Sequence, residues 1–305
     1  MSRLLLALAA LFLALLSTAG VASAADCRLV VPGSGERVPI GRTGRALLIH
    51  APTDLKPDRT TPIVFLLHGS GGNGAAMLNS SRLAEAADRH GFIVAAPDAG
   101  IPLPQGGFVW NIPGVPTIAG TVPGPRDADD VAYIRTAIDV LARDGCIDSE
   151  RVYVTGLSGG GRMSSWLGCV AADRIAAIAP VVGLRAGNPR KEDPTRPDPR
   201  TCRASRPMPV MAFAGAADTT NPITGGGAGY WSYTMHEAER RWAQLNRCRT
   251  PAPTVWVADG VYEERYTDCA ANTEVIGRIT VEGGHSWVAD NDAMWAFFSR
   301  YRRER

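Results

Sequence analysis

The sequence predicts an α/β fold, in which helices cover both faces of a mostly parallel central sheet. Short apolar runs, typical of strands buried on both faces, alternate along the chain with longer segments of helical periodicity. No repeat, low-complexity tract or linker divides the 305 residues. We therefore expect one domain over residues 25–305, built around a single core.

A signal peptide is expected over residues 1–24. Arg3 precedes an apolar run from Leu4 to Leu16, and the small residues Ala22-Ser23-Ala24 form a cleavage pattern. A membrane-spanning helix needs roughly 20 apolar residues, so we expect cleavage of this segment and no stable membrane anchor. The mature protein is accordingly expected to be secreted, either outside the cell or into the periplasm.

The charged residues narrow the classes of partner. The chain has 32 basic and 30 acidic residues and a net charge of +2, so no nucleic-acid partner is expected. Lysine occurs only at positions 56 and 191, and the other basic residues are arginine. This composition is typical of a GC-rich bacterial genome.

The first half of the chain contains a strand, helix, strand unit. Pro62–Leu67 and Phe92–Ala96 are short apolar runs, and Arg82–His90 between them has a helical pattern. Many Gly and Pro residues without a period make Ala99–Arg126 a long surface loop, of the kind that shapes pockets. In Asp129–Arg143 apolar residues recur at spacings of three and four, which predicts a helix with one buried face.

The second half continues the alternation. Val152–Thr155, Ile175–Val182 and Pro209–Phe213 are expected strands, and Arg162–Cys169 is an expected helix. Residues 184–208, rich in Pro, Arg and Asp, form a second long loop. The remaining expected elements are a helix at Glu237–Leu245, strands at Thr254–Val257 and Glu274–Val281, and a helix at Asp292–Arg300.

Ser158 is the predicted nucleophile. It is the centre of Gly156-Leu157-Ser158-Gly159-Gly160, the only G-x-S-x-G in the sequence, which lies between an expected strand and an expected helix. A sharp turn in this setting strains the serine backbone, leaves no room for flanking side chains and exposes the hydroxyl, as in α/β-hydrolases. The motif therefore refines the expected fold to the α/β-hydrolase fold. The alternative is a glycine-rich turn whose serine caps the following helix.

The nucleophile needs a base, which in this fold follows the nucleophile and the acid along the chain. Of the five histidines, only His236 and His285 follow the serine. His285 lies on a loop ahead of the last expected helix, whereas His236 lies within an expected helix. We predict His285 as the base, the alternative being a loop histidine bonded to the backbone.

The acid is expected at the end of a strand between the nucleophile and the base. Asp218 follows the expected strand Pro209–Phe213 and is the predicted acid, which would hold the imidazole in the right tautomer. A turn-capping aspartate is the alternative reading of this residue. Asp259 or Asp268 would then take its place.

Two backbone N–H groups are predicted to form the oxyanion hole. One belongs to Gly159, directly after the nucleophile. The other belongs to Ser70, or alternatively Gly69, in the turn His68-Gly69-Ser70-Gly71-Gly72. No Gly-Lys-Ser/Thr follows these glycines, so a phosphate loop is not expected. The imidazole of His68 is expected to support this turn.

Disulfide bonds are expected, because a chain predicted to leave the cytosol keeps an even number of cysteines. No C-x-x-C pair occurs, the spacings match no zinc site, and they do not choose among the pairings. No metal ion or organic cofactor is expected. The cysteines are Cys27, Cys146, Cys169, Cys202, Cys248 and Cys269.

Four motifs occur in the same order and spacing as in a known family. They are LLHGSGG at 66–72, VYVTGLSGGGRMS at 152–164, AGAAD ending at Asp218, and GGHSW at 283–287. Over roughly residues 27–303 the chain resembles the secreted polyhydroxybutyrate depolymerase and feruloyl or acetylxylan esterase family, which is carbohydrate esterase 1-like. The resemblance implies a catalytic triad of Ser158, Asp218 and His285.

The resemblance also implies substrates and disulfide pairs. The substrates are carboxylic esters, either hydroxybutyrate oligomers and polymers or the feruloyl and acetyl esters of plant polysaccharides. By analogy Cys169 pairs with Cys202 and Cys248 with Cys269, leaving Cys27 for Cys146. One departure is Gly159, which follows the serine where alanine or serine is frequent.

Two tryptophans are candidates for substrate binding. Trp110 lies in an irregular segment and Trp287 lies next to the predicted base, so they are expected to form an apolar wall, with ordinary packing as the alternative.

Two rival functions also stay open at this point: a peptidase on the same fold, and a non-catalytic extracellular binding protein on the same scaffold.

Overall fold

A ten-stranded sheet forms the centre of the part of the chain that the computed structural model describes, residues 29–30, 32–56, 59–145, 147–227 and 230–304. The strand order is β1-β2-β4-β3-β7-β8-β9-β12-β11-β10. Strands from β4 to β12 in this order are parallel, and the outer strands β1, β2, β11 and β10 are antiparallel. The expected parallel sheet is therefore present, with an antiparallel pair on each side.

The elements have the following bounds. The strands are β1 (Gly33–Pro39), β2 (Ala46–Ala51), β3 (Thr61–Leu67), β4 (Ile93–Pro97), β5 (Ile101–Pro102), β6 (Phe108–Val109), β7 (Ile147–Leu157), β8 (Ala177–Val181), β9 (Val210–Gly215), β10 (Thr250–Ala258), β11 (Val261–Thr267) and β12 (Val275–Thr280). The helices are α1 (Gly74–Ser81), α2 (Leu83–His90), α3 (Asp130–Asp144), α4 (Gly159–Val170), α5 (Met235–Leu245), α6 (Asn291–Phe298) and the short 3-10 helix η1 (Ala270–Asn272).

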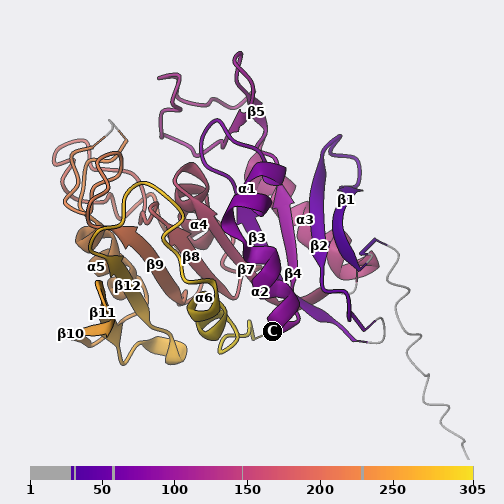
Figure 1. Cartoon of the computed structure of the whole chain (residues 1–305). Coiled ribbons are helices and arrows are strands. Elements are labelled where there is room, and N and C mark those ends of the chain that lie inside the picture. Colours follow the sequence, from indigo (N-terminus) through magenta and orange to yellow (C-terminus); the bar gives the residue numbers. More distant parts are fainter. Residues whose placement is uncertain (1–28, 31, 57–58, 146, 228–229, 305) are drawn as a thin grey trace, which may run out of the picture.

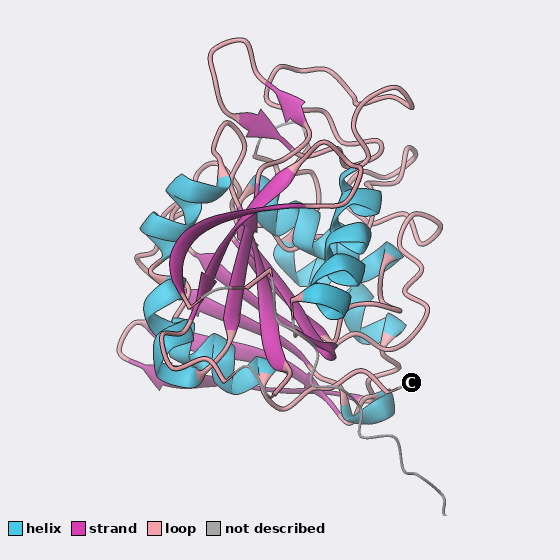
Figure 2. Cartoon of the chain, turned by 90° about the vertical axis from the view of Figure 1, so that its right-hand side faces the viewer, coloured by secondary structure: helices cyan, strands magenta, loops and turns pink. Residues whose placement is uncertain are grey.

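Both faces of the sheet are buried under helices (Figures 1 and 2). Two consecutive residues of β3 point to opposite faces of the sheet. Phe65 packs on one face with α3, α4 and α5, and Val64 packs on the other face with α1, α2 and α6. Every residue of β3, β4 and β9 is buried, which explains why these strands are continuous apolar runs. The predicted α/β fold with helices on both faces is confirmed.

Some elements differ from the expectation. Helix α4 begins at Gly159 and not at Arg162. Its first turn lies so close to β3 that it has to be made of glycine: a Cβ built on Gly160 would be 2.1 Å from the carbonyl oxygen of Leu67. Glycine has low helix propensity, so the sequence pattern placed these residues in the turn. The antiparallel strands β1, β2 and β11 and helix α1 were not predicted either. Neither β1 (GSGERVP) nor β11 (VYEERYT) is a continuous apolar run.

Two disulfides tie loops to the core. Cys169 at the end of α4 bonds to Cys202 in the long loop 184–208, and Cys248 bonds to Cys269 beside the hairpin of β10 and β11. Both pairs implied by the family resemblance are confirmed. The pair Cys27 and Cys146 lies outside the described residues, as does the predicted signal peptide. In the described residues, no helix is both long and apolar enough to cross a membrane.

Replacing Cys248 and Cys269 together with serine is expected to lower the free energy of unfolding by about 3 kcal/mol. The bond closes a loop with a sequence separation of 21 residues, and its loss gives the unfolded chain more freedom. Urea unfolding followed by circular dichroism measures the change. An unfolding midpoint equal to that of the parent protein would contradict this expectation.

Candidate active site

Ser158 stands between β7 and α4 with backbone angles φ 54° and ψ −109°. A non-glycine residue with positive φ is strained, and such strain persists where the surrounding structure enforces it. The flanking glycines explain how: a Cβ on Gly156 would lie 2.6 Å from the carbonyl oxygen of Leu67, at the end of β3. The strand-to-helix turn predicted from the G-x-S-x-G motif is thus present.

The structure brings Ser158, His285 and Asp218 together in one hydrogen-bonded chain. Nδ1 of His285 lies 2.8 Å from Oδ2 of Asp218, and Nε2 lies 2.9 Å from Oγ of Ser158. An ionised carboxylate can only accept a hydrogen bond. In this arrangement Nδ1 therefore carries a hydrogen and donates a hydrogen bond to Asp218. Nε2 is then free to accept from the serine hydroxyl, which is the arrangement a general base needs.

Asp218 is held in place by two backbone N–H groups. Its Oδ1 accepts from the N–H of Thr220 at 2.8 Å and from that of Asn221 at 2.9 Å, and the residue is 3% exposed. The amide of Asn221 in turn donates to the carbonyl oxygen of Val182, beyond the end of β8, at 2.7 Å. One carboxylate oxygen thus fixes the aspartate, and the other orients the histidine.

The loops that carry Asp218 and His285 lie directly against each other. They follow the parallel neighbours β9 and β12, whose carboxyl ends meet at the same edge of the sheet. Ala217 donates its N–H to the carbonyl oxygen of Gly283 at 3.0 Å, and a Cβ on Gly215 would lie 2.1 Å from that same oxygen. Only glycine at position 215 allows this approach.

The two predicted oxyanion donors are neighbours. A Cβ built on Gly159 would lie 2.9 Å from the backbone nitrogen of Ser70 and 2.4 Å from its Oγ. Gly159 is the first residue of α4, so its N–H has no partner within the helix. Both N–H groups therefore lie beside the Ser158 turn, where a tetrahedral intermediate would need donors.

His68 and Trp110 support the turn that carries Ser70. Nδ1 of His68 donates to the carbonyl oxygen of Gly69 at 2.7 Å, and Nε2 accepts from the N–H of Ala99 at 3.0 Å. Burial lowers the pKa of His68, in keeping with this neutral form. The indole N–H of Trp110 donates to the carbonyl oxygen of His68 at 2.8 Å. Trp110 is 4% exposed and packs in the core beside this turn, and a contact with substrate stays a prediction.

Two buried arginines near Ser158 were not identified from the sequence. Nη2 of Arg162 donates to Oγ of Ser70 at 3.3 Å, and the guanidinium lies 3.7 Å from the ring centre of Tyr230. Burial lowers the pKa of Arg162 to about 10. Arg185 donates to the carbonyl oxygens of Tyr230 and Tyr233. The available signal was Arg162 itself, a charged residue one helical turn after Ser158.

The other candidate residues take no part in the hydrogen bonds that join Ser158, His285 and Asp218. Trp287 is partly buried and donates its indole N–H to Oδ1 of Asn291 at 3.0 Å. His236 contacts Glu239 and Glu264, away from the triad. Of the substitute acids, Asp259 lies in the exposed turn between β10 and β11, and Asp268 forms an exposed ion pair.

Gly159→Ala is expected to lower kcat for p-nitrophenyl butyrate by about 100-fold, as displacing one oxyanion donor does. The new Cβ would overlap with Ser70, whose side chain fills the space beside Gly159, and the turn would have to move. Ser70→Gly combined with Gly159→Ala removes the closest contact and is expected to recover part of the loss. Steady-state kinetics measure both variants, and a fully active Gly159→Ala enzyme would contradict the placement of the donors.

Comparisons with known proteins place the chain among esterases. The profile of the family described as Esterase PHB depolymerase matches residues 47–220. Feruloyl esterase B of Piromyces equi is 30% identical over 84% of this chain and 45% of its own length. A putative esterase, NocK, of Nocardia uniformis subsp. tsuyamanensis is 32% identical over 62% of this chain and 49% of its own.

The chain therefore spans about half the length of these two curated relatives. Among solved structures, an acetyl xylan esterase from Aspergillus awamori superposes with a TM-score of 0.60 at 17% identity, covering 87% of this chain and 98% of that one. At this identity the superposition supports the α/β-hydrolase fold alone. The profile match covers more than half of the 305 residues, so the chain belongs to the Esterase PHB depolymerase family.

Proposed function

We propose that this protein is a secreted carboxylic ester hydrolase that works through a triad of Ser158, His285 and Asp218. The observation that carries the proposal is the chain of contacts from Oγ of Ser158 through the imidazole to Oδ2 of Asp218, 2.9 and 2.8 Å long. Membership of an esterase family supports the same chemistry. No step of this reaction requires a metal ion or an organic cofactor.

Acylation begins when Ser158 attacks the ester carbonyl carbon and Nε2 of His285 takes its proton. The imidazolium is stabilised by the carboxylate of Asp218, which keeps its charge. The carbonyl oxygen becomes an oxyanion and accepts hydrogen bonds from the N–H groups of Ser70 and Gly159. His285 then donates its proton to the departing alcohol oxygen, and an acyl-enzyme remains.

Deacylation repeats these steps with water as the nucleophile. Nε2 of His285 removes a proton from the water, whose oxygen attacks the acyl carbon of the ester on Ser158. A second oxyanion forms at the same two N–H groups, and its collapse returns the proton to Oγ of Ser158 and releases the carboxylic acid.

The proposed substrates are the esters of hydroxyalkanoate oligomers or the feruloyl and acetyl esters of plant polysaccharides. The relative named feruloyl esterase B supports the second group, and the family description supports the first. Hydrolysis of methyl ferulate, acetylated xylan and hydroxybutyrate oligomers, compared by kcat/KM, separates them. Hydrolysis of a peptide anilide faster than p-nitrophenyl butyrate would overturn the proposal in favour of a peptidase.

Covalent labelling tests the nucleophile directly. A fluorophosphonate is expected to modify Ser158 in the native enzyme, because only an activated serine reacts with such reagents. Peptide mass spectrometry then identifies the modified residue. Labelling at another serine, or none at all, would contradict the proposed acyl-enzyme.

Secretion and the domain organisation are part of the proposal. The disulfides Cys169–Cys202 and Cys248–Cys269 suit an oxidising compartment, which supports export with cleavage after residue 24. Residues 25–305 would then form one catalytic domain. N-terminal sequencing of the exported protein tests the cleavage position.

A further inference from the structure

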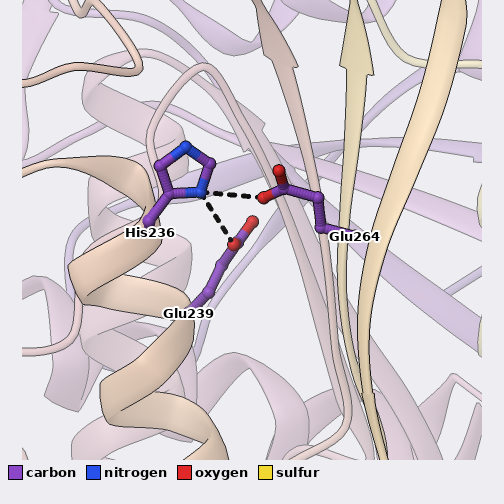
Figure 3. A group of neighbouring side chains, drawn as sticks. All are labelled: His236, Glu239 and Glu264. Carbon is purple, nitrogen blue, oxygen red and sulfur yellow. Dashed lines mark ion pairs between the residues drawn. The ribbon is translucent and has the colours of Figure 1, made fainter. Parts of the chain in front are cut away.

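A histidine and two glutamates meet on the side of the sheet covered by α5, outside the candidate active site (Figure 3). His236 and Glu239 are three residues apart on α5, and Glu264 lies on β11. Nδ1 of His236 is 2.8 Å from Oε2 of Glu264 and 3.6 Å from Oε2 of Glu239. One nitrogen and two carboxylate groups from two different elements therefore converge on one point.

These distances suit the ligands of a tetrahedral metal ion. Zinc binds histidine nitrogen and carboxylate oxygen at about 2.0–2.2 Å, which separates neighbouring ligand atoms by about 3.3 Å. The two measured separations, 2.8 and 3.6 Å, lie on either side of that value. All three ligand atoms lie within 4.8 Å of one another.

Glu239 provides a second, independent observation. The residue is 1% exposed, and within the described residues its Oε1 has no hydrogen-bond partner. Figure 3 shows this second carboxylate oxygen turned toward Glu264. Leaving a buried carboxylate oxygen unpaired is unfavourable, and the single Nδ1 of His236 cannot serve two carboxylates equally. A cation placed among the three groups would satisfy them together.

Gly277 makes room for this carboxylate. On β12 it is the direct cross-strand partner of Glu264, and a Cβ built there would lie 1.8 Å from Oε1 of Glu239. Glycine inside a strand weakens the strand and often marks the close approach of another group. Here the missing side chain lets the Glu239 carboxylate lie against the backbone of β12, beside Glu264.

We propose that His236, Glu239 and Glu264 bind a Zn²⁺ ion, with water at the fourth position. One imidazole nitrogen and two carboxylates suit zinc, whereas calcium and magnesium prefer ligand sets made of oxygen alone. The ion would neutralise two carboxylates and join α5 to β11. Because the site shares no residue with the triad, its role is to stabilise this side of the sheet.

Calorimetric titration of the metal-depleted full chain with Zn²⁺ tests the proposal. One ion is expected to bind per chain, and the melting temperature is expected to rise, since a ligand that binds the native state stabilises it. Glu264→Gln and His236→Asn are each expected to weaken binding at least tenfold. Glu237→Gln, on the same helix but outside the cluster, is the matched control and should bind as the parent does. Absent binding, or equal affinity in all variants, would overturn the proposal.

Two further measurements guard against misfolded variants and against zinc at other histidines. Gly277→Ala removes no ligand atom but displaces Glu239, and is expected to weaken binding as well, whereas His285→Gln should leave it unchanged. X-ray absorption of the zinc-loaded parent is expected to show a single imidazole among oxygen ligands. Several imidazoles in that spectrum, or loss of binding only in His285→Gln, would place the zinc elsewhere and refute the site.

Discussion

Ser158→Ala is expected to lower kcat/KM for p-nitrophenyl butyrate by about 10⁴-fold or more. The variant lacks the oxygen that attacks the carbonyl carbon, so no acyl-enzyme can form. The oxyanion donors stay in place, and a small residual rate above that of water is expected from them. Stopped assays with high enzyme concentration measure this residual rate.

The control for this variant is Ser286→Ala. Ser286 is exposed and lies next to His285, but it takes no part in the hydrogen-bonded chain, so its loss should change kcat/KM by less than about twofold. Both variants should unfold at the same temperature as the parent. A folded Ser158→Ala enzyme with the parental rate would refute the proposed nucleophile.

Asp218→Asn is expected to lower kcat by about 10⁴-fold with little change in the geometry of the site. The asparagine amide can donate a hydrogen bond to Nδ1, which favours the tautomer with the proton on Nε2. In that tautomer the histidine cannot accept the proton of Ser158. In this orientation the amide oxygen of the asparagine takes the place of Oδ1 of Asp218. It still accepts hydrogen bonds from the N–H groups of Thr220 and Asn221.

Asp259→Asn and Asp268→Asn are the matched controls for the acid. Both aspartates are exposed, and both were alternatives on sequence grounds. Each substitution is expected to leave kcat within about twofold of the parental value. A large loss in either control together with an active Asp218→Asn enzyme would mean that the acid had been wrongly assigned.

The meeting of Ser158, Asp218 and His285 was predictable from the sequence because each of these residues follows a strand. Parallel strands place their carboxyl ends at one edge, so Ser158 after β7, Asp218 after β9 and His285 after β12 were bound to lie near one another once the sheet was recognised. Glycines around each turn strengthened the prediction. Here the spacing and the local pattern carried the information.

Other features could not be read from the pattern. Arg162 contacts Ser70, which is distant in the sequence, and Trp110 contacts His68 through a long loop; both contacts depend on how irregular segments fold back. The cluster of His236, Glu239 and Glu264 has the same character, because Glu264 comes from the antiparallel strand β11, which was not predicted from the sequence. Its one local signal was the i, i+3 spacing of His236 and Glu239 on an expected helix.

The close contact between Gly215 and Gly283 bears on how the family can diversify. The segments that carry Asp218 and His285 are joined through the backbone, independently of the long loops 99–126 and 184–208. Substitutions in those loops can therefore alter the groups around an incoming ester while leaving the registry of Asp218 and His285 intact. Substrate range can therefore change through these loops, whereas a side chain at Gly215 would force the two backbones apart.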